Sequence, residues 1–312
     1  MKRTIFVLGA AGYIGKSVVQ EAVTAGWKVK ALVRAPASAL LMKGLGAEAV
    51  IGDAMNAVSW IEEARGCQLM VDLLQPKLPK RLSRRAIQAV ARYRIGVSRA
   101  ILNALMKLLE NERPLFINVS GVDDLAPDAD GKISHHSVLV EQLKGFAHIG
   151  VPVRKLLDGA GVQAVHVYLG TVYGPGKAFA ETVIPGLIRR TMPIIGNGSN
   201  RMALIHVEDA ARAIVHVCGQ RDKMLCGSNC VISDGTATTQ AEFMGGIAAM
   251  LKAKHPRRVP RFLATLLAGV VTTEVLSREC RTDISALQGL GFKLRYPDWR
   301  TGVPAMLDSM AC

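Results

Sequence analysis

The chain contains 312 residues, and its 39 lysine and arginine residues against 25 aspartate and glutamate residues give it a formal net charge of +14. Because 50% of the residues are hydrophobic, the composition excludes a disordered chain, which combines high charge with few apolar residues. The length predicts two structural units, with a core large enough to need no disulfide bonds. The start of the chain shows no secretory signal, and no apolar run reaches the length of a membrane-spanning helix, so we expect a cytoplasmic protein.

The cysteines indicate reduced thiols. None of the six cysteines forms a CxxC motif, the spacing typical of zinc sites and redox pairs. The nearest pair, Cys226 and Cys230, has no His or Cys partners at the spacing of metal ligands. We therefore expect neither a disulfide framework nor a metal site.

Strand-like and helical segments alternate through the first half of the chain. Short apolar runs predict strands at Thr4–Leu8, Trp27–Val33, Ala47–Ile51, Leu69–Leu74 and Leu115–Val119. Amphipathic segments predict helices at Lys16–Ala25, from Ser38, at Ser59–Ala64 and over Arg81–Asn111. Because parallel neighbouring strands need a crossover connection, this alternation predicts a doubly wound parallel sheet of the Rossmann type, in the α/β class.

From about Gly174 the alternation weakens, and isolated helices are predicted at Val207–Cys218 and Gln240–Lys252. We expect residues 1–173 to form a dinucleotide-binding domain and residues 174–312 to form a smaller α+β substrate lobe, with the chain crossing between the two. This lobe is expected to cover the carboxyl edge of the sheet, where open α/β sheets bind ligands.

A glycine-rich segment directly follows the first predicted strand. Gly9–Gly15 has the spacing GxxGxxG, which allows the backbone to turn sharply and approach a pyrophosphate at the start of the following helix. In this strand-turn-helix context the motif predicts dinucleotide binding, and the alternative is a structural turn. The residues expected to contact the cofactor are Gly9, Ala11, Gly12, Tyr13, Ile14 and Gly15.

Two further residues are expected to contact the cofactor. The acidic residue that commonly binds the ribose at the end of the second strand is replaced by Arg34, whose guanidinium is able to bind a 2′-phosphate, so NADP is favoured over NAD. Asp53, at the end of the third strand, offers an acceptor for the adenine amino group. The alternatives are that Arg34 is merely an exposed arginine at the end of a strand and that Asp53 is a helix N-cap.

Several motifs occur in one order along nearly the whole chain. They are LGAAGYIG around Gly9–Gly15, Gly52-Asp53, Ser120 after the fifth strand, Val172–Gly176, Ile205–Ala211 and Gly291-Phe292 with Tyr296-Pro297. Together they resemble the extended short-chain dehydrogenase/reductase family, of the NAD-dependent epimerase/dehydratase type. The resemblance implies a Rossmann domain with a small C-terminal substrate lobe.

The sequence departs from this family at its catalytic pair. The resemblance implies a Tyr-x-x-x-Lys pair on a helix, in which the phenol transfers a proton, the lysine lowers the pKa of the phenol, and a serine orients the carbonyl. Ser120 matches the serine, whereas Phe146 and Gly150 stand at the tyrosine and lysine positions. Since no tyrosine lies between Tyr93 and Tyr168, the chain resembles an atypical member that lacks the pair.

A working enzyme would need another group for proton transfer. His148 lies in the same predicted helix, and histidine titrates near neutral pH. Tyr168 carries a phenol that would be able to face the cofactor. The candidate catalytic residues are therefore Ser120, His148 and Tyr168, and the pair His135-His136 is a further acid–base candidate. The alternatives are surface histidines and a tyrosine packed in the core.

Basic residues gather in two clusters. The first basic cluster comprises Lys77, Lys80, Arg81, Arg84, Arg85, Arg92, Arg94 and Arg99, and the second comprises Lys252, Lys254, His255, Arg257, Arg258 and Arg261. Few aromatic residues are interleaved, so we expect a solvated surface that attracts the polyanionic cofactor, without nucleic-acid or membrane partners. Because the second cluster directly precedes the apolar run Phe262–Val271, contact with a membrane surface or a lipophilic substrate entrance is the alternative.

Two functions are compatible with these observations. The first is an NADP(H)-dependent enzyme that acts on a small organic carbonyl or alcohol, with Ser120 polarising the substrate oxygen. Without the tyrosine, isomerisation, cyclisation or elimination would be able to replace hydride transfer. The second is a non-catalytic NADP(H) sensor or assembly subunit that controls a partner. The resemblance also implies a homodimer through the helical region Arg81–Asn111, provided that its arginines face outward.

Overall fold

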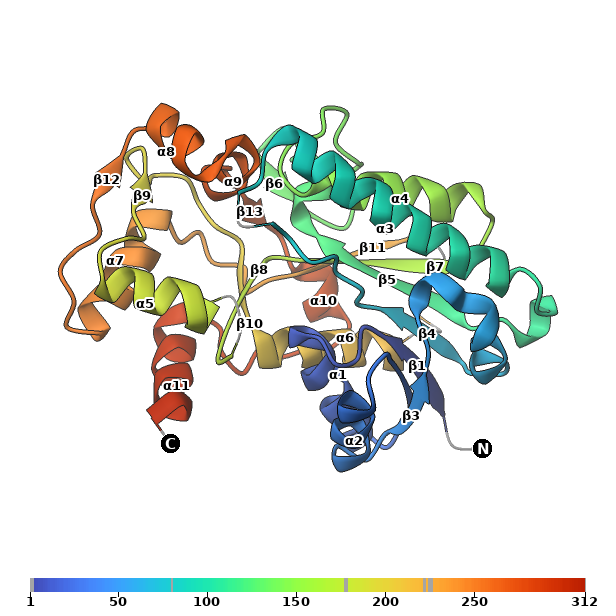
Figure 1. Cartoon of the computed structure of the whole chain (residues 1–312). Coiled ribbons are helices and arrows are strands. Elements are labelled where there is room, and N and C mark those ends of the chain that lie inside the picture. The colour runs from blue at the N-terminus through green and yellow to red at the C-terminus, as the bar shows by residue number, and fades with distance from the viewer. Residues whose placement is uncertain (1–2, 80, 177–178, 221–222, 224–226, 312) are drawn as a thin grey trace.

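The computed structural model describes residues 3–79, 81–176, 179–220, 223 and 227–311. Its main sheet has seven parallel strands in the order β11-β7-β5-β4-β1-β2-β3 (Figure 1). These strands are β1 (Thr4–Leu8), β2 (Lys28–Val33), β3 (Glu48–Ile51), β4 (Leu69–Asp72), β5 (Leu115–Gly121), β7 (Ala164–Leu169) and β11 (Asn229–Ile232). The strand order reverses between β1 and β4, which is where doubly wound sheets bind ligands.

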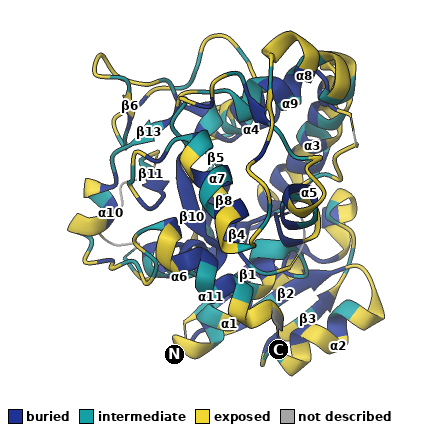
Figure 2. Ribbon diagram, turned by 90° about the vertical axis from the view of Figure 1, so that its left-hand side faces the viewer, coloured by how far each residue is buried: buried dark blue, intermediate teal, exposed yellow. Residues whose placement is uncertain are grey.

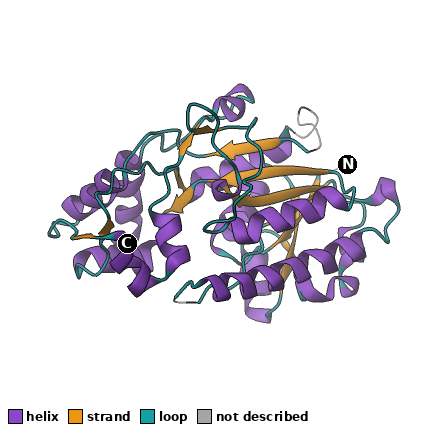
Figure 3. Cartoon of the chain, turned by 90° about the horizontal axis from the view of Figure 1, so that it is seen from above, coloured by secondary structure: helices purple, strands orange, loops and turns teal. Residues whose placement is uncertain are grey.

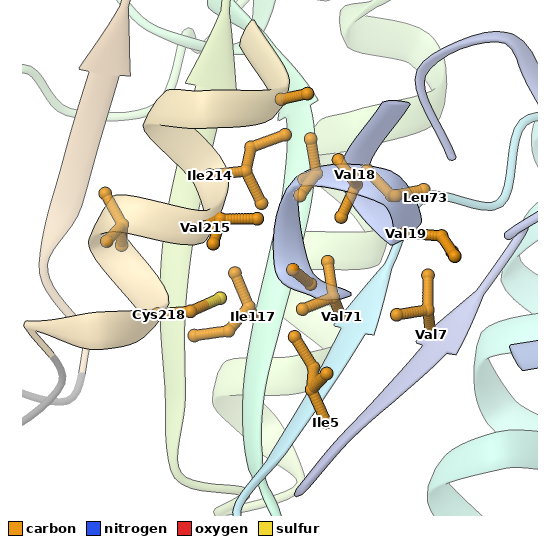
Figure 4. Packing of buried hydrophobic residues seen from close by; sticks show 14 of the residues in the cluster. Ile5, Val7, Val18, Val19, Val71, Leu73, Ile117, Ile214, Val215 and Cys218 are labelled. Atoms are coloured by element: carbon orange, nitrogen blue, oxygen red, sulfur yellow. The ribbon is translucent and has the colours of Figure 1, made fainter. Parts of the chain in front are cut away.

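One face of the sheet is covered by α1 (Tyr13–Thr24), α2 (Pro36–Gly44) and α6 (Val207–Gly219). Because parallel strands are buried on both faces, alternate apolar residues of each strand point into this layer. Val18 of α1 and Ile214 of α6 belong to the same buried cluster as Val71 and Ile117 of the strands (Figure 4). This layer fixes α1 against β1 and thereby positions the loop between them.

The other face is covered by α3 (Arg84–Leu105), α4 (Ala147–Gly159) and the short 3₁₀ helices η1 (Ala54–Ser59) and η2 (Ile61–Ala64). Ile101 of α3 and Leu157 of α4 are buried in one cluster with Phe6, Met70 and Phe116 of the strands. Burial colouring shows dark strands enclosed by helices whose outer surfaces are exposed (Figure 2). Since α4 lies over β5 and β7, its first turn lies near the carboxyl ends of these strands.

A second region with its own core follows in the later part of the chain. Residues from five later elements, β8 (Thr171–Tyr173), α5 (Ile184–Ile188), β10 (Leu204–His206), α7 (Gln240–Met250) and α11 (Trp299–Ala311), form a separate buried cluster. It includes Tyr173, Leu204, Phe243, Trp299 and Val303. The view from above separates this helical region, which contains the C-terminus, from the main sheet (Figure 3). The remaining strands are β6 (Lys132–Ile133), β8 (Thr171–Tyr173), β9 (Ile194–Ile195), β10 (Leu204–His206), β12 (Arg258–Val259) and β13 (Arg281–Thr282). The remaining helices are α5 (Ile184–Ile188), α7 (Gln240–Met250), α8 (Arg261–Ala268), α9 (Val270–Leu276), α10 (Ser285–Gly289) and α11 (Trp299–Ala311), with the short turns η3 (Glu110–Glu112), η4 (Val122–Asp124) and η5 (Phe179–Val183).

Asp209 joins α6 to the segment that leads into α11. Its carboxylate is fully buried and accepts hydrogen bonds from the backbone N–H groups of Arg295 at 2.9 Å and Tyr296 at 2.7 Å. His206 caps α6 by accepting a hydrogen bond of 3.3 Å from the N–H of Glu208. The motif Ile205–Ala211 and the motif at Tyr296 therefore form one structural joint.

The expected fold class is confirmed, because a doubly wound parallel sheet carries a smaller C-terminal region. Several boundaries differ from the prediction by a few residues. α1 begins at Tyr13 rather than Lys16, because its extended N-cap is Gly12, and α3 spans Arg84–Leu105 rather than Arg81–Asn111. The segment Ser59–Ala64 lies in 3₁₀ turns rather than an α-helix, because the backbone of Trp60 interrupts it. The division at residues 173 and 174 stays a prediction; α6 and β11 return to the main sheet, as a chain crossing between lobes requires.

Candidate active site

The glycine-rich loop connects β1 to α1 at the carboxyl edge of the sheet. Gly9 has φ +75°, and a Cβ there would lie 2.7 Å from the carbonyl oxygen of Leu73, so this position requires glycine. A Cβ at Gly15 would clash with the backbone oxygens of Gly9 and Ala10. The two glycines allow α1 to begin directly against the loop.

The first turn of α1 presents N–H groups to the space above the loop. Its N-cap is Gly12, which supplies no side-chain cap. The N–H groups of the first helical residues, among them Tyr13 and Ile14, therefore have no partner within the helix and are suited to bind an anion. A Cβ at Gly174 would lie 3.0 Å from the Tyr13 hydroxyl, so this turn lies against the later glycine motif. The loop and turn fit a pyrophosphate.

The residues expected at the adenosine end lie after β2 and β3. Arg34 is exposed, and no hydrogen bond or ion pair within the described part of the chain engages its guanidinium. One carboxylate oxygen of Asp53 accepts a hydrogen bond of 2.8 Å from the N–H of Met55 and caps η1. The alternative role of Asp53 as an N-cap is therefore present, and its contact with adenine stays a prediction.

Ser120 lies near the carboxyl end of β5 and is paired with a buried carboxylate. Its hydroxyl donates a hydrogen bond of 2.6 Å to Oδ2 of Asp124. The chain leaves β5 through the 3₁₀ turn Val122–Asp124, which brings the carboxylate back over the strand end. Asp124 is only 1% exposed, so its charge has little access to water.

The side chain of Asp124 fills the space next to position 150. A Cβ at Gly150 would clash with the carboxylate oxygens of Asp124. Gly150 lies on α4, so no longer side chain is able to start there while Asp124 keeps its place; that this is the position of the family lysine stays a prediction. The buried carboxylate of Asp124 and a side chain longer than that of glycine at position 150 thus exclude each other.

The surroundings of Asp124 move its titration toward neutral pH. Burial raises the pKa of Asp124 to about 7, against the lowering effect of the Ser120 hydrogen bond. The neighbouring carboxylate of Asp123, whose pKa burial also raises, forms an ion pair of 3.0 Å with Arg278. Since a proton-transfer group works best when its pKa lies near the operating pH, Asp124 has the property expected of such a group.

The structure does not bring His148 to Ser120. Gly150 lies on the face of α4 that meets Asp124, whereas His148, two residues before it in the helix, lies on nearly the opposite side. No hydrogen bond or ion pair of His148 occurs among the described residues. Its part in proton transfer stays a prediction.

Tyr168 lies on β7 in register with Ser120 of β5. Its side chain is fully buried, and its phenol oxygen accepts a hydrogen bond of 3.1 Å from Arg154. Burial raises the pKa of Tyr168 to about 12, which makes the phenol a weaker acid than usual. The structure thus shows the packed core tyrosine that was the alternative expectation.

A cavity of about 730 Å³ is lined by Asp123, which directly precedes Asp124, while neither Ser120 nor Asp124 is among its lining residues. Its wall includes Asp123 and Gly145, which directly precede Asp124 and Phe146, and this volume is typical of small-molecule sites. Glu274 and Arg278 of α9 and its C-terminal extension also line the cavity. The cavity has room for a small molecule.

Sequence reasoning missed Asp124 and the reason for Gly150. The spacing Ser120-x-x-x-Asp124 was visible, but only the turn after β5 shows that it closes a hydrogen bond. The histidine pair His135-His136 lies after β6 with its ring centroids 3.8 Å apart, and within the described residues neither ring bonds to Ser120.

One residue of the first basic cluster is not a surface residue. Arg94 is 5% exposed and forms an ion pair of 2.5 Å with Asp72, at the end of β4. The prediction that it belongs to a solvated basic surface is wrong, because α3 directs its side chain onto the sheet, where Ser98 also accepts a hydrogen bond from it.

The described residues contain no group of three or more His, Cys, Asp or Glu side chains able to hold a metal ion. Cys226, one of the closest cysteine pair, lies outside the described residues, whereas Cys230 is a buried free thiol. Within the same part of the chain, every helix is too short or too polar to cross a membrane.

The family model of the NAD dependent epimerase/dehydratase family matches residues 5–233. The chain belongs to this family. The match confirms the resemblance to the family. That Phe146 and Gly150 stand in place of the catalytic tyrosine and lysine stays a prediction.

Other proteins of known name are similar over nearly the whole chain. A protein named ceramide reductase from Caulobacter vibrioides is 24% identical over 310 residues, which cover 98% of this chain and 88% of that protein. The human epimerase family protein SDR39U1 (isoform 2), solved with NADPH, has a TM-score of 0.78 at 18% identity and covers 98% of this chain and 99% of its own. A double mutant of the dTDP-glucose 4,6-dehydratase DesIV from Streptomyces venezuelae, solved with NAD and DAU bound, has a TM-score of 0.75 at 17% identity, with 98% and 96% covered. The solved structures support the fold of the epimerase/dehydratase family.

Proposed function

We propose that this chain is an NADP(H)-dependent oxidoreductase that acts on a small organic carbonyl or alcohol, with Ser120 and Asp124 supplying the proton path. The observation that carries the proposal is the 2.6 Å hydrogen bond between Ser120 and the buried carboxylate of Asp124, whose neighbour Asp123 lines the 730 Å³ cavity. Burying an ionisable carboxyl group lowers the stability of the fold, and carboxyl groups with a pKa shifted toward neutrality are concentrated at catalytic sites.

The glycine-rich loop supports a nicotinamide dinucleotide as the cofactor. Gly9 and Gly15 keep the loop free of side chains, and Gly12 leaves the helix N–H groups open for the pyrophosphate. The unpartnered guanidinium of Arg34 favours the 2′-phosphate of NADP, and a similar structure contains NADPH. When bound, the cofactor donates or accepts a hydride.

The Ser120–Asp124 pair would hold and move the proton. Below its pKa, the Asp124 carboxyl group donates its proton to Oγ of Ser120, so the serine hydroxyl is free to donate toward the cavity. In a reduction, Ser120 gives its proton to the substrate oxygen as that oxygen gains negative charge, and Asp124 replaces it. In an oxidation the same steps run in reverse. Isomerisation, cyclisation or elimination would use the same pair without net redox change.

Among these reactions, the similarity to the protein named ceramide reductase favours reduction of a carbonyl by this chain. The four described cysteines are free and buried, which supports the expected cytoplasmic location. The homodimer through α3 stays a prediction.

A panel of aldehydes and ketones incubated with NADPH tests the proposed function. We expect loss of the nicotinamide absorbance with at least one carbonyl, and at least roughly a hundredfold slower loss in Ser120→Ala, because the proton path is removed. Ser59→Ala, an exposed serine on η1, is the matched control. The alternative, an NADP(H) sensor, predicts tight NADPH binding without catalysis: the nicotinamide absorbance stays constant, and no substrate is converted, not even by a reaction without net redox change.

A further inference from the structure

The two basic clusters, which lie far apart in the sequence, meet at α8. The guanidinium of Arg81, from the first cluster, donates a hydrogen bond of 2.9 Å to the carbonyl oxygen of Leu266 on α8. The N–H of Val271, just after α8, donates a hydrogen bond of 3.2 Å to the carbonyl oxygen of Leu82. The second cluster runs directly into α8, whose first residue is Arg261. The fold thus brings one end of each cluster to the same helix.

This helix exposes an apolar face. Phe262 is 76% exposed, Leu266 66% and Leu267 69%, and Leu263 is 36% exposed. Residues one, four and five positions after Phe262 lie on the same side of a helix, so these four side chains form one stripe. The opposite side of α8 is anchored by Ala264, which is buried. Figure 2 shows α8 as an exposed helix at the edge of the molecule.

The apolar stripe is flanked by cations without acidic partners. Arg81 contacts α8, Arg84 and Arg85 follow it at the start of α3, and Arg257, Arg258 and Arg261 lead into α8; all six are exposed. None of the salt bridges formed within the described residues involves any of them, although other surface arginines, such as Arg300, are paired. An uncompensated positive rim around a protruding apolar stripe is complementary to a surface that is negative outside and apolar within.

We propose that the apolar stripe of α8 docks on the surface of a bilayer that contains anionic phospholipid. Phe262, Leu266 and Leu267 enter the boundary between headgroups and acyl chains, and the basic rim binds the lipid phosphates. A nucleic acid or a free anion would use the cations and leave the stripe in water, so neither explains both features. This proposal takes up the alternative of contact with a membrane surface that the sequence left open.

Docking on α8 would also place the candidate active site beside the lipid. Arg261, the first residue of α8, lines the 730 Å³ cavity together with Val275 of the following helix. The cavity and the stripe therefore share an edge of the molecule. The docking surface itself does not depend on the proposed catalytic function.

Flotation of the full-length protein with vesicles tests this proposal. We expect binding to vesicles of phosphatidylcholine with phosphatidylglycerol, little binding to phosphatidylcholine alone, and weaker binding as salt rises. Combined Phe262→Ser, Leu266→Ser and Leu267→Ser changes are expected to lower vesicle affinity roughly tenfold or more. Because these side chains are exposed, the variant should keep its thermal unfolding midpoint, which confirms that it is folded.

A matched control separates docking on α8 from general attraction of a basic protein. The variant Leu40→Ser with Lys43→Gln removes an exposed leucine and a lysine from α2, which lies on the other side of the molecule (Figure 1). We expect this variant to bind like the unchanged protein. No binding to anionic vesicles, or equal losses in both variants, would overturn the proposal.

A fluorescent reporter gives an independent test. Phe262→Trp is expected to show a blue-shifted emission when anionic vesicles are added, whereas Leu40→Trp, at a site that is 71% exposed, should show none. If sedimentation showed instead that α8 is covered by a second copy or by an acidic protein in preference to vesicles, the bilayer assignment would be wrong.

Discussion

The carboxylate of Asp124 occupies the space in which a side chain at Gly150 would begin. This relationship links the end of β5 to the first turns of α4, and it explains why position 150 is glycine in this chain. The buried carboxylate then takes its hydrogen bond from Ser120. The candidate site is thus built around a carboxyl group.

Enlarging Gly150 should disturb this packing. We expect Gly150→Ala to lower the free energy of unfolding by on the order of 2 kcal/mol, because the added methyl group must displace Asp124. Gly159→Ala, in the same helix with no atom within 4 Å of the new Cβ, should change the stability little or raise it slightly. Urea unfolding measures both variants. Equal effects at the two positions would contradict the packing argument.

The protonation of Asp124 should make stability depend on pH. Its pKa rises from 3.8 in the unfolded chain to about 7 in the folded protein, so the folded state holds the proton more tightly. The stabilisation that the tighter proton binding gives the folded state is fully present below about pH 4 and is lost as the pH rises through about 7. The unfolding free energy of the unchanged protein should therefore fall relative to that of Asp124→Asn as the pH rises from about 4 to about 7. A difference that stays constant with pH would show that Asp124 does not titrate there.

Arg34 should determine the choice of cofactor. We expect Arg34→Ala to weaken NADPH binding roughly tenfold to a hundredfold, because charge-assisted hydrogen bonds to the 2′-phosphate are lost, and to leave NADH binding unchanged. Lys43→Ala, on the exposed surface of α2, is the control for a lost positive charge. Calorimetric titration with both nucleotides measures the effect. Parallel losses for NADPH and NADH would argue against this role.

Asp209 should stabilise the joint between α6 and the segment before α11. Asp209→Ala leaves the N–H groups of Arg295 and Tyr296 without their acceptor, and we expect it to lower the unfolding free energy by on the order of 3 kcal/mol. Asp308→Ala, an exposed residue of α11, should have little effect. Thermal unfolding compares the stability of the two variants. An Asp209→Ala variant as stable as the unchanged protein would show that other contacts hold α6 against the segment before α11.

The main features of the fold could be predicted because they depend on local patterns. Apolar runs of strand length and the spacing of Gly9, Gly12 and Gly15 are visible in the sequence, and their order implies the parallel sheet. The Ser120–Asp124 pair could not be predicted, because it depends on how the turn after β5 meets α4. The burial of Arg94 and the meeting of Arg81 with Leu266 also depend on contacts between distant segments, which no local pattern contains.

The pH dependence of the first turnover tests the proposed proton path most directly. With a carbonyl substrate identified from the panel, the rate of NADPH oxidation should fall as the pH rises through about 7, because the protonated form of Asp124 is required. In Asp124→Asn the rate should be low and independent of pH across that range, while NADPH affinity stays unchanged. A variant that retains the original rate and the original pH profile would contradict the assignment of Asp124 as the source of the proton.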